Sequence, residues 1–196
     1  MFYGLSKIVL ALIFLDWIFF LGWGMVSPIL AVFITVEIGG SIAQAGLAVA
    51  VAFLSRAVLQ IPLSILLDRK EGERDDFFAL AASIVLAGFV AFGYYFAQEM
   101  WHVYGLQALE GFRGALYAAT WPAIFSRHIN LRRASLSWSL DTATVAVIAG
   151  VAGGLGGYLV QSLGFRVVFL IVAVLSFLSL IPVFLARPFL GSGLTQ

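Results

Sequence analysis

The chain has 196 residues, of which 62% are hydrophobic and 11% are charged, and its formal net charge at pH 7 is +1. An average soluble domain is roughly 45–50% apolar and 25% charged, so this composition indicates a membrane protein. The sequence has no Cys and only two His, which excludes a disulfide framework, a thiol nucleophile and Cys-ligated metal sites, and we expect no metal and no cofactor. The nearly neutral charge excludes a nucleic-acid-binding surface.

Six apolar stretches are long enough to cross the roughly 30 Å hydrocarbon core of a bilayer as α-helices. They run at 8–36, 42–67, 77–98, 102–126, 136–161 and 166–186. The first is too long for a signal-peptide core and lacks a small-residue cleavage pattern, so we expect it to be retained. We therefore predict an all-α membrane protein in which residues 1–196 form a single six-helix transmembrane domain.

Positive charge is concentrated on one side of the predicted spans, whereas the other side has only Arg166. The residues on the positive side are Lys7, Arg69, Lys70, Arg74, Arg127, Arg132, Arg133 and Arg187. Lys and Arg are retained on the cytoplasmic side during insertion, so both termini and the loops 68–76 and 127–135 are predicted to be cytoplasmic. We expect a multi-pass protein of the inner membrane or another cell membrane, surrounded by lipid.

Ionisable residues occur inside only four of the predicted spans. Asp16 lies in the first span, Arg56 in the second, Glu110 and Arg113 in the fourth, and Asp141 in the fifth. A charge that faces lipid costs at least about 2.5–3.5 kcal/mol at the helix centre, so such residues face the bundle interior or water. We predict that these four spans line a polar cavity and that the third and sixth spans lie outside it.

The two halves of the chain carry a weak internal repeat. Asp16 precedes Pro28 by 12 positions, and Glu110 precedes Pro122 by the same 12. A copy of three spans has an odd number of crossings, so the second copy must insert upside down relative to the first. We predict two inverted three-helix repeats. They correspond to about 1–98 and 99–196.

The fifth span is rich in glycine, and Gly150, Gly153 and Gly157 are its candidate packing positions. The spacing of Gly153 and Gly157 places both on one helix face, where a neighbouring helix can approach closely. A phosphate-binding loop is excluded, because no Lys-Ser or Lys-Thr follows and the glycines lie within a span.

Four segments together resemble the N-terminal six-helix half of a major facilitator superfamily transporter of the drug/proton antiporter kind. The segment 64–74 is similar to the family's cytoplasmic loop motif, Gly-x-x-x-Asp-Arg/Lys-x-Gly-Arg/Lys-Arg/Lys, with Ser64 in place of the first Gly and one extra residue before Gly72. The resemblance assigns a cytoplasmic gate motif to Asp68, Arg69, Gly72 and Arg74.

The other three segments lie in the second half of the chain. The segment 107–115 is similar to the family's Arg-x-x-x-Gly span, with Gln107 in the Arg position and Arg113 one turn from Gly111 as a candidate substitute. The segment 152–157 resembles the Gly-Pro-x-x-Gly-Gly antiporter motif with its Pro and first Gly replaced, and 164–166 resembles the Gly-Trp-Arg that opens the sixth span. The family's cavity is lined by the first, second, fourth and fifth spans, in agreement with the distribution of charges.

The resemblance implies a secondary active transporter, not an enzyme, that moves a small organic solute by alternating access, with proton coupling and efflux as expected features. Asp16 is the first candidate for ion coupling, followed by Glu110 and Asp141. Two structural alternatives stay open. Glu110 could simply neutralise Arg113 at i+3, and Asp141 could pair with an arginine of the 127–135 loop.

Candidates for substrate binding combine polar groups with flat apolar surfaces. They are Arg56, Arg113, Gln107, Trp17, Trp23, Tyr117 and Trp121. Arg56 has no partner on its own span, so it must find a carboxylate elsewhere in the bundle or an anionic substrate group. The aromatic rings could equally be packing residues. The glycine-rich fifth span and the Asp in the first favour an amphipathic or cationic organic substrate.

Members of this family usually join two such halves in one chain, whereas these 196 residues contain one. We expect two copies to form a parallel homodimer about an axis along the membrane normal. A separate partner half, a fragment of a longer transporter and a non-transporting membrane module are the alternatives. An intramembrane enzyme is disfavoured, because no catalytic constellation occurs within a span.

Overall fold

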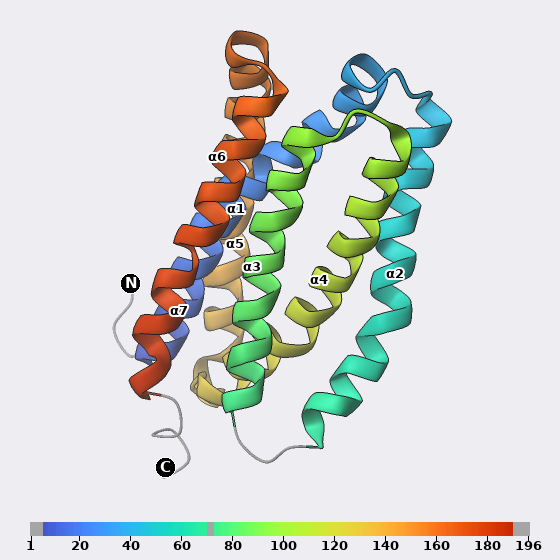
Figure 1. Cartoon of the computed structure of the whole chain (residues 1–196). Helices are drawn as coiled ribbons and strands as arrows, with labels where there is room; N and C mark the ends of the chain where they lie inside the picture. The colour runs from blue at the N-terminus through green and yellow to red at the C-terminus, as the bar shows by residue number, and fades with distance from the viewer. Residues whose placement is uncertain (1–5, 70–72, 190–196) are drawn as a thin grey trace.

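The computed structural model describes residues 6–69 and 73–189. It contains helices and no strand in these ranges, so the predicted all-α class is confirmed (Figure 1). The elements are α1 (Lys7–Val32), a π-helical turn η1 (Phe33–Glu37), α2 (Ile42–Asp68), α3 (Arg74–Phe96), α4 (Met100–His128), a short turn η2 (Leu131–Arg133), α5 (Ala134–Leu163), α6 (Phe165–Leu178), α7 (Leu180–Ala186) and η3 (Arg187–Phe189).

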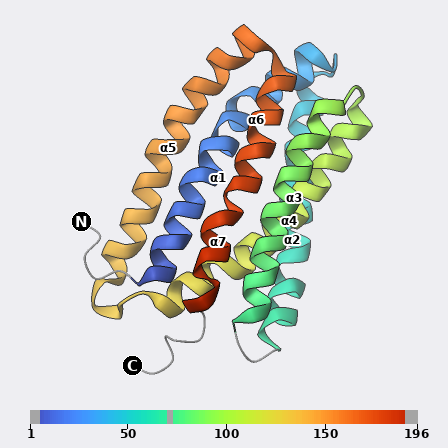
Figure 2. The same ribbon diagram turned by 60° about the vertical axis from the view of Figure 1, so that its left-hand side comes forward.

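The long helices form two layers. A four-helix layer has the order α5, α1, α4, α2, because α1 packs against α5 and α4, and α4 packs against α2. Behind this layer, α3 and α6 pack on each other, α3 against α4 and α6 against α1. Figure 2 shows α5 and α2 at opposite ends of the arrangement. The start of α1 and the end of α7 lie at the same end of the bundle (Figure 1).

The helix contacts have an internal symmetry. If α1, α2 and α3 are exchanged with α4, α5 and α6, the main contacting pairs stay the same. The pair α1–α5 becomes α4–α2, and the pair α1–α6 becomes α4–α3. The pairs α1–α4 and α3–α6 map onto themselves, and α1 and α4 run in opposite directions (Figure 1). This is the contact pattern of two inverted three-helix repeats, as the sequence predicts.

Five of the described helices are long and apolar enough to cross a membrane. By length and composition they are Lys7–Glu37, Ile42–Asp68, Arg74–Phe96, Leu131–Leu163 and Phe165–Ala186. The helix that does not qualify is α4, although it has 29 residues and lies between α1 and α2. Its low apolar content comes from polar residues such as Gln107, Glu110 and Arg113, which border a cavity between helices.

Two irregularities interrupt the predicted spans. The C-terminal end of α1 widens into the π-helical turn, in which the amide of Ile38 donates to the carbonyl of Phe33 at 3.1 Å. The last span is broken at Ser179, between α6 and α7. Pro182 explains this break, because proline has no N–H to donate to the carbonyl four residues earlier and its ring clashes with that carbonyl.

The contact between α1 and α5 is close because glycines lie on both helices. A Cβ at Gly24 would lie 2.9 Å from the Cα of Ala149, and a Cβ at Gly156 would lie 2.8 Å from the carbonyl oxygen of Met25. Neither glycine could carry a side chain without separating the two backbones. The closest approach of α5 to α1 therefore uses the stripe formed by residues 149, 152 and 156.

The glycines chosen from the sequence lie one residue away from this stripe. Gly153 is in ordinary contact with α1, since a Cβ there would lie 3.6 Å from the carbonyl oxygen of Gly24. A Cβ at Gly150 or Gly157 would meet no described atom within 4 Å, so these two make no close contact within the described chain. Successive helical residues are about 100° apart, so Gly150 and Gly157 lie on a neighbouring face of α5.

The contact between α2 and α4 depends on Gly111. A Cβ at this position would collide with the carbonyl oxygen of Ala52, and it would lie 2.6 Å from the Cβ of Ser55 and 3.0 Å from the amide nitrogen of Arg56. Two of these three atoms belong to the backbone of α2, which cannot move aside without moving the helix.

We predict that Gly111→Ala destabilises the protein by about 1–3 kcal/mol, because the added methyl group overpacks the α2–α4 contact. Gly105→Ala is the matched control on the same helix, since a Cβ there meets no described atom within 4 Å. It should be neutral or slightly stabilising, because alanine is the better helix former. Thermal unfolding of both variants in mild detergent measures the difference, and equal stabilities would contradict the packing role of Gly111.

Candidate functional site

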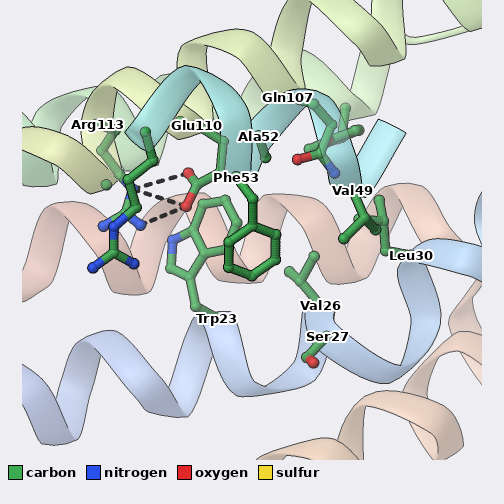
Figure 3. Close-up of a pocket in the computed structure, with 14 residues that line it drawn as sticks. Trp23, Val26, Ser27, Leu30, Val49, Ala52, Phe53, Gln107, Glu110 and Arg113 are labelled. Atoms are coloured by element: carbon green, nitrogen blue, oxygen red, sulfur yellow. Dashed lines mark hydrogen bonds and ion pairs between the residues drawn. The ribbon is translucent and has the colours of Figure 1, made fainter. Parts of the chain in front are cut away.

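A cavity of about 300 Å³ lies in the four-helix layer between α1, α2 and α4 (Figure 3). The wall from α1 includes Trp23 and Ser27, the wall from α2 includes Phe53 and Arg56, and α3 contributes Tyr94. The wall from α4 is formed by Gln107, Glu110, Gly111, Arg113 and Gly114. Among the described residues that line this cavity, none comes from α5. The prediction that the fifth span also lines this cavity is not supported, because α5 packs mainly on the far side of α1, with further contacts to α6.

Glu110 and Arg113 form an ion pair at the edge of the cavity. The Arg113 Nε donates to both carboxylate oxygens of Glu110 at 2.9 Å, and Nη2 donates to Oε1 at 2.5 Å. The Arg113 guanidinium also lies over the rings of Phe19, Trp23 and Tyr117, at 5.4, 5.7 and 5.8 Å from their centroids. Of the two interpretations made from the sequence, mutual neutralisation is the one that this geometry supports.

Arg56 is less well paired. Its Nε donates to Oε1 of Gln60 one turn along α2, at 3.3 Å. Its aliphatic carbons lie over Gly114, with Cδ 3.3 Å from the place where a Cβ would be. Within residues 6–69 and 73–189, no carboxylate oxygen lies within 4.0 Å of the Arg56 guanidinium. Arg56 therefore forms no direct ion pair with a carboxylate of the described chain, although its charge interacts electrostatically with Glu110.

Two further polar side chains border the cavity. Gln107 is 4% exposed and Tyr94 is 2% exposed, and neither side chain forms a hydrogen bond with another described residue. The Tyr94 ring is held by edge contact with Phe33 and stacking on Phe169. The sequence identified Gln107 but missed Tyr94, because Tyr94 lies in a span that contains no charge.

A second polar cluster joins α1, α4 and α5. Asp16 is 3% exposed, and the Tyr117 hydroxyl donates a hydrogen bond to its Oδ1. Asp141, from α5, is 5% exposed, and its carboxyl group interacts with that of Asp16. The Oδ1 of Asp141 has no hydrogen-bond partner in the described chain. Two acids that are 125 positions apart in the sequence therefore share one buried site.

The alternative role considered for Asp141 is not found. An ion pair with Arg132 or Arg133 would require Asp141 to face the end of the bundle. Instead its carboxyl group is buried, and no ion pair joins it to either arginine in the described residues.

Of the predicted aromatic residues, only Trp23 lines the cavity. The Trp17 indole N–H donates to the Thr144 hydroxyl at 2.8 Å and so links α1 to α5. Trp121 is buried and stacks on Phe125 and on Tyr117. These rings form the packed core of one half of the bundle, which the sequence could not distinguish from a substrate surface.

The predicted gate motif lies between α2 and α3. Asp68 is the last residue of α2, Arg69 is its C-cap and Arg74 begins α3, and all three are exposed. Gly72 lies outside the described residues.

An ion pair and a contact between an imidazole and a carboxylate, both missed by the sequence analysis, join the start of α3 to the end of α4. Arg127 pairs with Asp76, and His128 Nε2 lies 3.5 Å from Oε2 of Glu73. The sequence does contain a signal for these contacts. Acidic residues occur in the first turn of α3 and basic residues in the last turn of α4, where the helix dipole favours each of them.

Inverted three-helix repeats around a polar cavity are the architecture of half of a secondary transporter. The sequence profile of the Major Facilitator Superfamily matches residues 12–193, and the chain belongs to this family. Comparison with curated protein sequences gave no match. Members of the family are transporters of small molecules rather than enzymes, and the chain is accordingly a multi-pass membrane protein.

We predict that Glu110 and Arg113 are strongly coupled. Removal of one partner leaves a mostly buried charge alone, so Glu110→Gln and Arg113→Gln should each cost about 3–5 kcal/mol. The double variant removes both charges and should cost clearly less than the sum of the two single changes. Unfolding of the four proteins in detergent measures this coupling, and additive losses would show that the pair contributes nothing.

Proposed function

We propose that the chain is one half of a secondary active transporter, which moves a small organic solute by alternating access and works as a parallel homodimer. The observation that carries this proposal is the polar cavity between α1, α2 and α4, which lies beside a helix face that one chain leaves uncovered. Along α2 only Ala45 and Ala48 are buried, so an apolar face is left uncovered beside the cavity. A second copy, turned about an axis along the membrane normal, would cover that face and enclose the cavity.

We propose that coupling uses the Asp16–Asp141 pair. Two carboxylates in one buried site repel each other, and a proton held between them would relieve this repulsion. Loss of the proton would leave like charges on the neighbouring helices α1 and α5, which favours their separation at that depth. Glu110 fits this role less well, because Arg113 engages both of its carboxylate oxygens.

The proposed orientation places the start of α1, the 68–74 connection and the end of α7 on the cytoplasmic side. The positive charges gathered at this end support it, because Lys and Arg are retained on the cytoplasmic side of a membrane. Asp68, Arg69, Gly72 and Arg74 would then form a cytoplasmic gate, as the family resemblance implies.

We predict that Asp16→Asn and Asp141→Asn each lower pH-gradient-driven flux by at least about tenfold, since neither amide can exchange a proton. Both variants should fold, because replacing a buried acid by its neutral isostere adds no burial cost. Glu37→Gln is the control, since Glu37 is an exposed acid at the end of η1, the turn that follows α1.

The measurement is flux in proteoliposomes that carry an imposed pH gradient, with a panel of radiolabelled organic anions, cations and neutral solutes. Wild-type flux that is independent of the gradient would exclude proton coupling. Full activity in both Asp variants would exclude this acid pair as the coupling site.

We predict that Val58→Cys and Val147→Cys, combined in one chain, give a disulfide-linked dimer in native membranes. Val58 on α2 and Val147 on α5 are 70% and 67% exposed. Their two helices lie at opposite ends of the four-helix layer (Figure 2). In a parallel dimer, α2 of one copy would face α5 of the other. The wild-type sequence has no Cys, so the cross-link would report this contact alone.

The control combines Phe89→Cys and Val174→Cys, which are both 56% exposed on the α3–α6 layer and should not cross-link. Cross-links to another protein only, or a monomer in mild detergent without any cross-link, would contradict the homodimer. These outcomes would favour a separate partner half.

A further inference from the structure

The cavity between α1, α2 and α4 contains more hydrogen-bond donors than acceptors. Its one carboxylate, Glu110, already accepts three hydrogen bonds from Arg113. The charges of this pair cancel, and Arg56 is the remaining charged group among the residues that line the cavity. A bound solute would therefore meet a net charge of +1, set by Arg56.

The geometry leaves the Arg56 guanidinium available to a solute. The absence of a side chain at Gly114 lets Arg56 lie across α4 at the cavity, with its Nε directed to Gln60. Its two terminal nitrogens have no partner among the described residues, and a guanidinium with two free N–H groups matches the two oxygens of a carboxylate. An unpaired charge at this depth is costly unless a solute or water satisfies it.

The neutral polar groups of the cavity also include donors. The Gln107 amide and the Tyr94 hydroxyl border the cavity, are more than nine-tenths buried, and form no hydrogen bond within the described chain. Gln107 lies seven residues before Gly114 on α4, about 10 Å away at 1.5 Å per residue. Between these polar ends, the indole of Trp23 and the ring of Phe53 provide an apolar surface (Figure 3).

We infer that the solute is an organic anion with one negative charge and a flat apolar body, whose anionic group binds Arg56 and whose body lies between Trp23 and Phe53. This inference rests on the proposed transport function and names its substrate class. It replaces the cationic substrate favoured by the sequence, because Asp16, on which that preference rested, does not line this cavity, and Glu110, which does, is neutralised by Arg113.

The test uses three probes of nearly equal shape: 2-naphthoate, 2-naphthamide and 2-naphthamidinium, with charges of −1, 0 and +1. Their binding to the purified full chain is measured by calorimetry in phosphatidylcholine nanodiscs, which contain no anionic lipid. We expect 2-naphthoate to bind at least about tenfold more tightly than the amide, as a charge-assisted contact with Arg56 implies, and the amidinium to bind most weakly.

Three variants identify the cation responsible. Arg56→Gln should remove the preference for 2-naphthoate over 2-naphthamide, and Arg56→Lys should retain part of it, because the charge stays but the planar fork is lost. Arg166→Gln, at the far end of the bundle, removes an equal charge and should retain the full preference.

Equal binding of the three probes, tightest binding of the amidinium, or an unchanged preference in Arg56→Gln would overturn the inference. Loss of 2-naphthoate binding when phosphatidylglycerol is added to the nanodiscs would identify a lipid headgroup as the anion that Arg56 holds, which would also overturn it. The flux assay separates this inference from the proposed function. Binding of 2-naphthoate without flux of any solute would refute transport but support the anion site. Flux of cations alone would support transport but refute the anion site.

Discussion

The ion pair of Glu110 with Arg113 is the interaction on which the rest of the cavity depends. It lets α4 carry two opposite charges at the middle of the bundle, where neither could face lipid alone. It also directs the Arg113 guanidinium onto the aromatic rings of α1, so α1 and α4 are joined at the centre of the four-helix layer. Because the charges of Glu110 and Arg113 cancel, the net charge of the cavity is set by Arg56 on α2.

Two close helix contacts, each between a helix of the first repeat and a helix of the second, place these groups. Gly111 brings the backbone of α2 against α4, and Gly114 gives the Arg56 side chain a place to lie. Gly24 and Gly156 bring α5 equally close to α1, the helix pair that contains Asp16 and Asp141. Close helix contacts at glycine thus place a cationic group at one end of the layer and an acidic pair at the other. Helices at the ends of the layer can approach the centre only where a side chain is missing.

Much of the fold could be predicted from composition and apolar run length, because a bilayer fixes the length of a helix and requires its backbone to be satisfied internally. Rotation of each helix about its axis could not be predicted, since it is set by the packing of the whole bundle. For this reason Gly156 rather than Gly157 meets α1, and Tyr94 rather than a residue of α5 borders the cavity. The pairing of Asp16 with Asp141 could not be predicted from the sequence either, because it depends on contacts between helices far apart in the chain.

Tyr117 touches both polar sites. Its hydroxyl donates to Asp16, and its ring lies under the Arg113 guanidinium at the edge of the cavity. Under the proposed mechanism, a proton arriving at the acid pair changes the hydrogen bond that this side chain makes, and a solute arriving in the cavity changes the environment of its ring. Thermodynamic linkage is reciprocal, so each ligand would then alter the affinity for the other by the same factor. A single tyrosine would serve as the stoichiometric link that keeps protons from leaking across the membrane without solute.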